Sequence, residues 1–369
     1  MSVVAVAGDT GGTVPAAAPK LIAYVTSWSP PVAIDTSRIT HVNFAFARID
    51  VHGRVVLPDD ASATRLAEIV AAKRTSPALR VLISVGGWGA DGFSDAALTD
   101  DSRGRFADSA VALMRSHAAD GIDLDWEYPG QSTAGIRARP VDKRNFTLLL
   151  AALRGRLDTR SRGDRRAPGD GYLLTIASAD REYFDHVEME VLHAELDWIN
   201  VMAYDFYNSL TPTTGHHAGL YRAATAPVSS RWADASVEQH LAAGVPARKL
   251  VLGVAFYGRR FEGVTADDLG RNQPYERYGG DHAYAQLVTG YVDRGGFKRH
   301  WDETAQAPWL WNATTRSFIS YDDPRSIDLK SAYARQRGLG GIMFWELAQD
   351  ASAALLDAAH RSLTGSNRD

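Results

Sequence analysis

Residues 120–129, with the sequence DGIDLDWEYP, determine the interpretation of the whole chain. Within this stretch three large apolar residues alternate with three acidic ones, namely Ile122, Leu124 and Trp126 with Asp123, Asp125 and Glu127. Successive side chains of a β-strand point to opposite faces, so one face is apolar and the other carries carboxyl groups. Large apolar residues between helix-compatible sequences are typical of a buried parallel strand. Carboxyl groups lined up in a protein interior have raised pKa values, which is costly for folding and useful for catalysis.

The stretch is one of eight short apolar segments, and most of them are separated by a helix-compatible sequence. The segments are residues 21–28, 39–49, 80–88, 121–128, 172–179, 198–206, 249–259 and 340–347. Helices are expected at residues 62–73, 102–119, 142–157, 236–243 and 327–337. This alternation predicts an α/β fold, a (β/α)8 TIM barrel. A doubly wound open sheet is the alternative, but no glycine-rich phosphate loop follows any of the segments.

Three parts of the chain are expected. Residues 1–19 are small and polar and are interpreted as a flexible leader or the trimmed remnant of a longer precursor. The barrel is assigned to residues 20–260 and 322–365. Residues 261–321 form too long a connection for a barrel loop and are rich in tyrosine and tryptophan, which predicts a small α+β subdomain beside the barrel mouth.

Composition excludes several classes of function. The chain has 369 residues and a formal net charge of −4, which does not indicate binding to nucleic acid or to a membrane surface. No run of about 18 apolar residues is present to span a bilayer. The absence of cysteine excludes disulfides, thiol catalysis and thiolate metal sites. A monomer is expected.

Side chains that could take part in catalysis or binding lie at the ends of the predicted strands, where TIM barrels place their catalytic groups. They are Tyr24, Phe46, Trp88, Glu127, Tyr204, Asp205, Tyr257, Arg259 and Trp345. Any one of these aromatic residues, taken alone, is more often part of a core than of a binding site. Together on one rim, aromatic faces flanked by carboxylates suit a sugar, because pyranose rings have apolar C–H faces and polar edges.

The sequence resembles the chitinases of glycoside hydrolase family 18 from about Lys20 to Leu363. DGIDLDWEYP matches the family signature DGxDxDxE, and SVGGW at residues 84–88 is similar to its second signature. Further blocks occur in the family's order, namely MAYD at 202–205, FYGR at 256–259, YDDPRS at 321–326 and GGIMFWE at 340–346. The segment after FYGR is similar to the chitinase insertion domain.

The resemblance implies a mechanism that also suits the residues. A retaining glycosidase ordinarily uses two carboxyl groups about 5 Å apart, one of them the nucleophile. Here Asp125 and Glu127 are neighbours on one strand face, which supplies an acid but no obvious enzyme nucleophile. The family instead uses the acetamido oxygen of its substrate. Glu127 would be the general acid and base, Asp125 would hold the acetamido N–H, and Asp123 would share a proton with Asp125.

The resemblance also assigns the other site residues. Tyr204 would donate a hydrogen bond to the acetamido oxygen, and Asp205 would bind the same sugar. Trp345 would lie beneath that sugar. The remaining contacts would come from Tyr24, Phe46 and Met202 around it and from Trp88, Tyr257 and Arg259 at neighbouring rings. The expected substrates are chitin and chito-oligosaccharides, the expected location is extracellular, and no cofactor or metal is expected.

Three alternatives remain open. The carboxylates could hold a divalent metal, although His41, His216 and His217 have no ligand spacing and the last two are expected in a solvated loop. The chain could be a non-catalytic carbohydrate-binding protein, although inactive relatives typically lack the acid at the position of Glu127. It could also be an endo-β-N-acetylglucosaminidase that acts on glycoproteins, since that activity uses the same acetamido mechanism.

Overall fold

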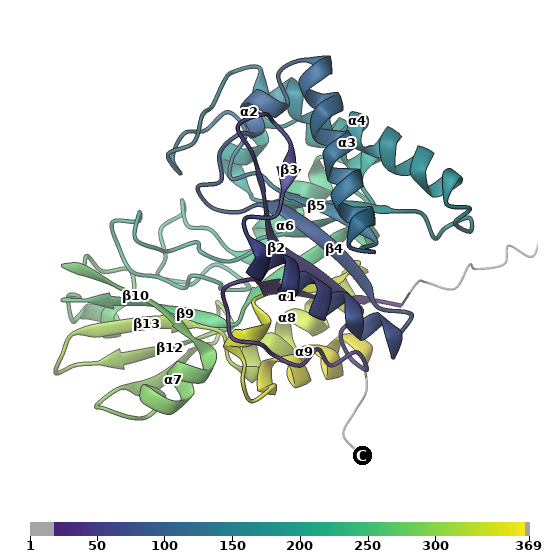
Figure 1. The fold of residues 1–369 in the computed structure, drawn as a ribbon. Coiled ribbons are helices and arrows are strands. Elements are labelled where there is room, and N and C mark those ends of the chain that lie inside the picture. Colours follow the sequence, from purple (N-terminus) through teal and green to yellow (C-terminus); the bar gives the residue numbers. More distant parts are fainter. Residues whose placement is uncertain (1–17, 366–369) are drawn as a thin grey trace, which may run out of the picture.

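The computed structural model describes residues 18–365 and contains a closed barrel of eight parallel strands (Figure 1). The strands are, in order around the barrel, β1 Lys20–Thr26, β2 His41–Ile49, β4 Arg80–Gly86, β5 Gly121–Asp125, β6 Leu173–Ser178, β7 Trp198–Val201, β8 Leu250–Ala255 and β14 Gly341–Trp345. Strand β1 pairs with both β2 and β14, which closes the barrel. The predicted TIM barrel is confirmed. The expected leader lies outside the described residues except at positions 18 and 19.

Helices cover the outside of the barrel. They are α1 Asp60–Ala71, α2 Phe93–Ala96, α3 Asp100–Ser116, α4 Asp142–Gly163, α5 Met189–Leu192, α6 Ala233–Ala242, α8 Pro324–Gln336 and α9 Ala354–Thr364. N-cap side chains fix where some of these helices begin. Asp59 at the start of α1 and Thr99 at the start of α3 each accept a hydrogen bond from a backbone N–H in the first turn. Between β1 and β2, by contrast, the described chain is not helical. Within residues 18–365 no helix is both long and apolar enough to cross a bilayer.

The seventh predicted segment is divided between two sheets. Strand β8 ends at Ala255, and β9 Tyr257–Glu262 opens a separate antiparallel sheet with the order β10-β9-β13-β12-β11. Its other elements are β10 Arg277–Ala283, α7 Tyr284–Gly290, β11 Lys298–Asp302, β12 Ala307–Asn312 and β13 Ser317–Tyr321. The sheet therefore begins before residue 261, and Tyr257 and Arg259 belong to it rather than to a barrel strand.

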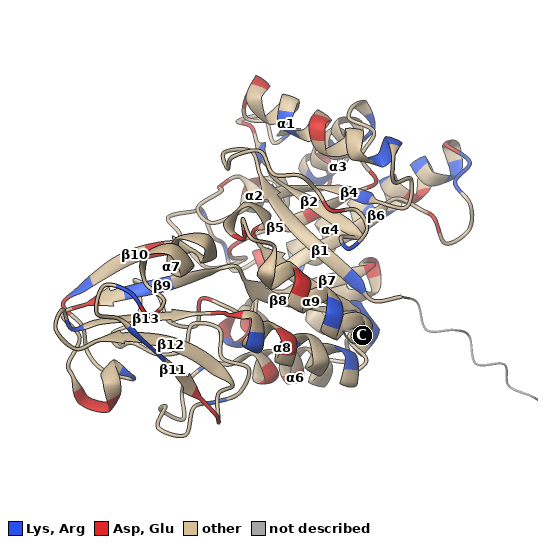
Figure 2. Ribbon diagram, turned by 90° about the horizontal axis from the view of Figure 1, so that it is seen from below, with Lys and Arg blue, Asp and Glu red and all other residues tan. Residues whose placement is uncertain are grey.

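This insertion subdomain stands beside the barrel mouth, and both views show it as a separate layer (Figures 1 and 2). Figure 2 also shows acidic and basic residues interspersed along the outer helices and the subdomain. A two-stranded extension, β2 with β3 Val55–Val56, completes the barrel sheet.

A buried ion pair joins the end of the subdomain to the barrel. Lys330 Nζ lies 2.6 Å from both carboxylate oxygens of Asp322, and both side chains are buried. Asp322 also accepts from Ser326 Oγ at 2.7 Å and from the backbone N–H of Ala255 at 3.4 Å. The pair thus links the residue that follows β13, where the insertion subdomain ends, to the end of β8, where the subdomain begins.

Removal of one partner of this pair is expected to destabilise the protein strongly. Lys330→Met leaves the Asp322 carboxylate buried without its counter-charge, which costs about 3–5 kcal/mol. Urea unfolding of this variant, compared with the exposed Lys298→Met as a control, measures the loss in free energy of unfolding. Equal stability of the two variants would contradict the role given to the pair.

Candidate active site

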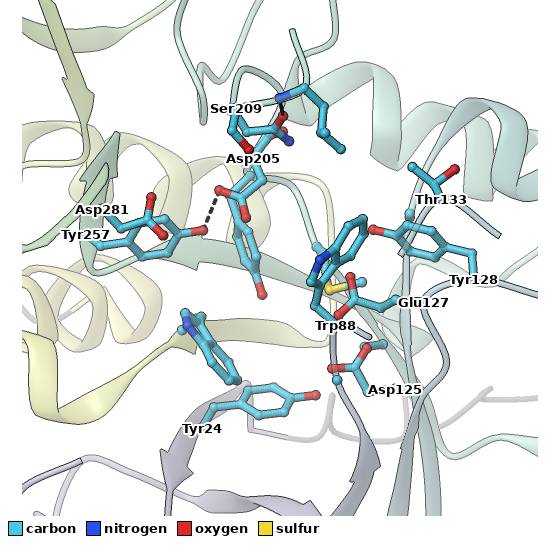
Figure 3. Close-up of a pocket in the computed structure, with 18 of the residues that line it drawn as sticks. Tyr24, Trp88, Asp125, Glu127, Tyr128, Thr133, Asp205, Ser209, Tyr257 and Asp281 are labelled. Atoms are coloured by element: carbon cyan, nitrogen blue, oxygen red, sulfur yellow. Dashed lines mark hydrogen bonds between the residues drawn. The ribbon is translucent and has the colours of Figure 1, made fainter. Parts of the chain in front are cut away.

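A pocket of about 620 Å³ opens at the carboxyl ends of the barrel strands (Figure 3). It brings together nearly all the side chains predicted from the sequence, namely Tyr24, Phe46, Trp88, Asp125, Glu127, Met202, Tyr204, Asp205, Tyr257, Arg259 and Trp345. Asp123 is buried beneath them. The pocket also includes Trp28, Arg48, Tyr128, Gln131, Arg231 and Asp281, which the sequence analysis did not single out. Trp28, Arg48 and Tyr128 lie within the predicted apolar segments and could have been noticed, whereas Gln131, Arg231 and Asp281 carry no comparable signal.

Two glycines of the SVGGW motif allow strands β4 and β5 to meet at the pocket floor. Gly86 and Gly87 have φ values of +123° and +89°. A Cβ atom on Gly86 would lie 2.1 Å from the backbone oxygen of Asp125, and one on Gly87 would lie 2.5 Å from the ring of Phe46. The Gly87 N–H donates to the same Asp125 oxygen at 2.9 Å. The motif therefore positions the backbone of Asp125, and only glycine fits both positions.

The deepest carboxyl group, Asp123, is surrounded by donors from other strands. It accepts hydrogen bonds from Tyr24 Oη at 2.7 Å, Ser84 Oγ at 2.7 Å, Thr175 Oγ1 at 2.6 Å and Asn200 Nδ2 at 3.2 Å. Burial raises the pKa of Asp123, while the four donors act in the opposite direction. No hydrogen bond joins Asp123 to Asp125 in the described part of the chain, so the proton sharing of this pair stays a prediction.

The next two carboxyl groups form one wall of the pocket (Figure 3). Burial, followed by the charges of Glu127 and Asp123, raises the pKa of Asp125 well above its ordinary value. Its Oδ1 atom is buried and has no hydrogen-bond partner among residues 18–365. Desolvation raises the pKa of Glu127 to about 7, with the charge of Asp205 contributing and a hydrogen bond from Tyr128 opposing. Glu127 can therefore donate a proton near neutral pH.

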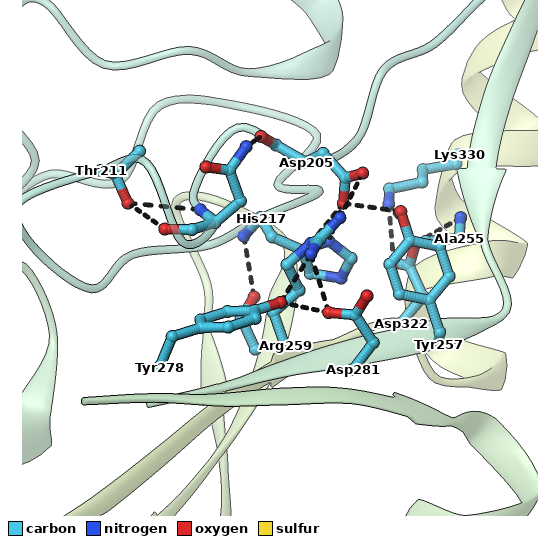
Figure 4. Close-up of polar contacts among 12 residues, drawn as sticks. Asp205, Thr211, His217, Ala255, Tyr257, Arg259, Tyr278, Asp281, Asp322 and Lys330 are labelled. Carbon is cyan, nitrogen blue, oxygen red and sulfur yellow. Dashed lines mark hydrogen bonds and ion pairs between the residues drawn. The ribbon is translucent and has the colours of Figure 1, made fainter. Parts of the chain in front are cut away.

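Asp205 is held on the other side of the pocket by residues of the insertion subdomain (Figures 3 and 4). Its Oδ1 atom accepts from Tyr257 Oη and from Arg259 Nε, both at 2.6 Å, and its Oδ2 atom lies 2.5 Å from Arg259 Nη2. Burial acts to raise the pKa of Asp205, but neighbouring His217 and the charge of Arg259 outweigh it, so the net shift is downward. Asp205 is therefore a charged carboxylate whose lone pairs are largely occupied.

The backbone of Asp205 is also constrained. Its φ of 59° lies in the left-handed region, which costs a residue with a side chain of order 1–3 kcal/mol. Arg259 is held from its other side by Asp281 at 2.7 Å and by Tyr278 Oη at 2.5 Å (Figure 4). Two side chains of the subdomain, Arg259 and Tyr257, therefore help to fix where the carboxylate of Asp205 points.

Aromatic side chains form the apolar surfaces of the pocket. Trp345 stacks on Phe46 with ring centroids 5.7 Å apart and lies 5.6 Å from Tyr24. Trp88 is 54% exposed and makes an edge contact with Tyr128 at 6.2 Å. The exposed face of Trp88 and the half-buried face of Trp345 match the C–H faces of sugar rings.

The hydroxyl of Tyr204 is only weakly engaged in this pocket. It donates to the sulfur of Met343 at 3.8 Å, and thioether sulfur is a weak acceptor. Burial raises the pKa of Tyr204 well above its ordinary value, so the group stays protonated. Tyr204 can therefore donate to a ligand oxygen.

Two of the three histidines do not lie as the sequence predicted. His216 and His217, expected in a solvated loop, are 6% and 0% exposed and pack between the barrel and the insertion subdomain. His41 packs edge-on against Trp198, with ring centroids 4.9 Å apart. Within residues 18–365 no group of three or more His, Cys, Asp or Glu side chains is arranged to hold a metal ion.

Comparison with known proteins places this pocket in a family. Residues 20–350 match the model of the glycosyl hydrolases family 18. The chain is 36% identical to chitinase A1 of Niallia circulans over 91% of its own length and 57% of that protein, so it spans little more than half of this relative. It is 35% identical to chitotriosidase-1 of Mus musculus, covering 90% of this chain and 74% of the relative.

Among solved structures, a family 18 N-acetylglucosaminidase from Paenibacillus barengoltzii superposes with a TM-score of 0.88 at 40% identity. That match covers 94% of this chain and all of the other. Family model, relatives and fold agree with the motifs of the strand ends. The predicted family is confirmed, and this chain belongs to the glycosyl hydrolases of family 18.

Proposed function

We propose that this chain is a chitinase that hydrolyses the β-1,4 linkages between N-acetylglucosamine units of chitin and chito-oligosaccharides with retention of configuration. The observation that carries this proposal is the arrangement of carboxyl groups. Asp125 and Glu127 occupy one wall, and Asp205, on the other side, is bound by Arg259 and Tyr257. A carboxylate engaged in this way is a poor nucleophile, so the nucleophile is the substrate's own acetamido oxygen.

The steps follow from the positions of the groups. Glu127 gives its proton to the glycosidic oxygen as the bond from C1 to that oxygen breaks, and the acetamido oxygen bonds to C1. Asp125, one oxygen of which has no partner among residues 18–365, accepts the acetamido N–H and stabilises the positive charge of the cyclic intermediate. Tyr204 donates to the acetamido oxygen. Ionised Glu127 then takes a proton from water. The water oxygen attacks C1, and the bond between C1 and the acetamido oxygen breaks.

The remaining pocket residues bind the sugar rings. Trp345 supports the reacting sugar with Tyr24, Phe46 and Met202 around it, and Trp88 faces a neighbouring ring. The names of chitinase A1 and chitotriosidase-1 support chitin as the polymer. Chitin lies outside cells, which supports an extracellular location, and the complete pocket within one chain supports action as a monomer.

One experiment separates this function from the alternatives. Mass spectrometry of products is carried out with a chitin hexamer and, in parallel, with an N-linked glycoprotein. A chitinase produces short N-acetylglucosamine oligomers from the first and leaves the second intact. An endo-β-N-acetylglucosaminidase does the reverse, and a non-catalytic binding protein leaves both unchanged.

Glu127→Gln is expected to abolish hydrolysis and to preserve binding. The amide keeps the shape of the side chain but cannot protonate the leaving oxygen, a contribution of about 10²–10⁴-fold or more. Hydrolysis of chitin hexamer and calorimetric binding of the same oligomer are the measurements. Asp125→Asn is expected to lose less activity, because its role is orientation. Activity of Glu127→Gln within about a factor of two of the unmodified protein would contradict its assignment as the acid.

The pH dependence follows from the pKa of Glu127, raised to about 7. The acid must carry its proton in the free enzyme, so kcat/KM is expected to fall as pH rises through about 7. The charge of Asp205 contributes to this raised pKa, so in Asp205→Asn the fall is expected at lower pH. A pH–rate profile of residual activity checks the direction. An alkaline limb at the same or higher pH would show that Asp205 does not act on Glu127.

Removal of the acetamido group is expected to remove the reaction. The enzyme should cleave chitin oligomers and leave cellulose oligomers and fully deacetylated chitosan intact, although the linkage is the same. Tyr204→Phe should lose part of the rate, and a thiazoline analogue of the cyclic intermediate should inhibit strongly. Hydrolysis of cellohexaose, or a sugar trapped covalently on Asp125 or Asp205, would identify an enzyme carboxylate as the nucleophile.

A further inference from the structure

His217 lies at the point where the barrel, the insertion subdomain and the pocket meet. Its backbone oxygen accepts from the N–H of Phe206, the residue after Asp205, at 3.0 Å. Its backbone N–H donates to Ser320 Oγ on β13 at 2.8 Å. Its ring lies 5.3 Å from the ring of Tyr257 on β9. The side chain is completely buried, so it cannot contact substrate.

The imidazole of His217 is aimed at Asp205 without being bonded to it. Nδ1 lies 3.6 Å from Asp205 Oδ1, slightly beyond hydrogen-bond distance (Figure 4). Neither ring nitrogen has a hydrogen-bond partner among residues 18–365. Burial of such a donor is unfavourable unless it finds an acceptor, and Asp205 is the adjacent one. A movement of less than about one ångström would form the bond, and catalytic hydrogen bonds commonly tighten when substrate binds.

We propose that His217 is a positioning residue that holds the Asp205 carboxylate and the Tyr257 ring in place against the reacting sugar. The proposal rests on the function proposed above. The charged and titratable groups around Asp205 are Arg259, Tyr257, Tyr204, His217 and Glu127. Arg259 and Tyr257 approach from the subdomain, while His217 lies on the barrel loop that also carries Asp205. His217 therefore makes the carboxylate's position depend on both parts of the protein.

Displacement of Asp205 has two consequences. The sugar that Asp205 binds is misplaced, and such errors lower kcat/KM severely, by as much as about 10²-fold for one ångström. The charge that helps to keep Glu127 protonated also moves away, so the pKa of Glu127 falls. A merely structural residue would produce neither effect in the protein that remains folded.

The neighbouring His216 offers a matched control. It is 6% exposed, its Nε2 lies 3.2 Å from Asp302 Oδ2, and its ring lies 5.7 Å from Trp309. These contacts are in the insertion subdomain and outside the pocket. His216→Leu and His217→Leu therefore remove the same imidazole from adjacent buried positions. His217→Asn is the conservative variant, because the amide nitrogen of Asn occupies the place of Nδ1.

The three variants are compared by chitin-hexamer kinetics over pH, by thermal unfolding and by crystallography. His217→Leu is expected to lower kcat/KM about tenfold or more, to move its alkaline limb to lower pH and to shift the Asp205 carboxylate. His217→Asn should recover much of the activity, and His216→Leu should lose stability alone. Should His217→Leu not fold, His217→Ala, which also removes the imidazole, takes its place in the same comparison.

Two results would overturn the proposal. One is unchanged kinetics and an unchanged pH profile in the folded variant that lacks the polar group, His217→Leu or His217→Ala. The other is a crystal structure of that same variant with Asp205 and Tyr257 unmoved. Failure of the unmodified protein to cleave chitin would refute the proposed function instead, and the crystallographic comparison would still test the role of His217.

Discussion

One buried carboxylate, Asp123, makes the geometry of the pocket possible. Its oxygens collect donors from four other barrel strands, through Tyr24 on β1, Ser84 on β4, Thr175 on β6 and Asn200 on β7. A carboxylate buried without such partners would be very unfavourable, so the strands must stay at the spacing that satisfies it. Because Asp125 and Glu127 follow on the same strand and the turn after it, their positions are set by this network.

The pocket keeps two carboxyl groups in opposite states by means of their surroundings. Glu127 is desolvated and lies near the negative charge of Asp205, so its pKa rises to about 7. Asp205 is desolvated as well, yet Arg259 and His217 bring its pKa below its ordinary value. A proton donor and a fixed negative charge therefore coexist in one cavity. The insertion subdomain supplies Arg259, whose charge keeps the pKa of Asp205 below that of Glu127.

Much of this could be predicted from the sequence, for reasons of periodicity. Alternation placed Asp123 and Asp125 on one face of a strand, and nearly all the residues predicted from the strand ends line the pocket. What escaped depends on contacts between distant segments. His217 was expected in solvent because its partners, Asp205 and Ser320, approach it only in the folded protein. The break after Ala255 was missed because apolar sequence continues through Phe256 into β9.

The closure of the barrel by β1 and β14 has a consequence for synthesis on the ribosome. The first and last barrel strands are neighbours, with Lys20 paired to Gly341. Until the last strand emerges, β1 and β8 each present an unpaired edge, which is a template for association with other chains. The insertion subdomain, by contrast, is built from strands close together in the sequence and can form while the barrel is still open. The nascent chain can therefore carry a folded subdomain on a barrel that is still open. Its strand edges need protection from association with other chains until β14, which begins at Gly341, has been synthesised.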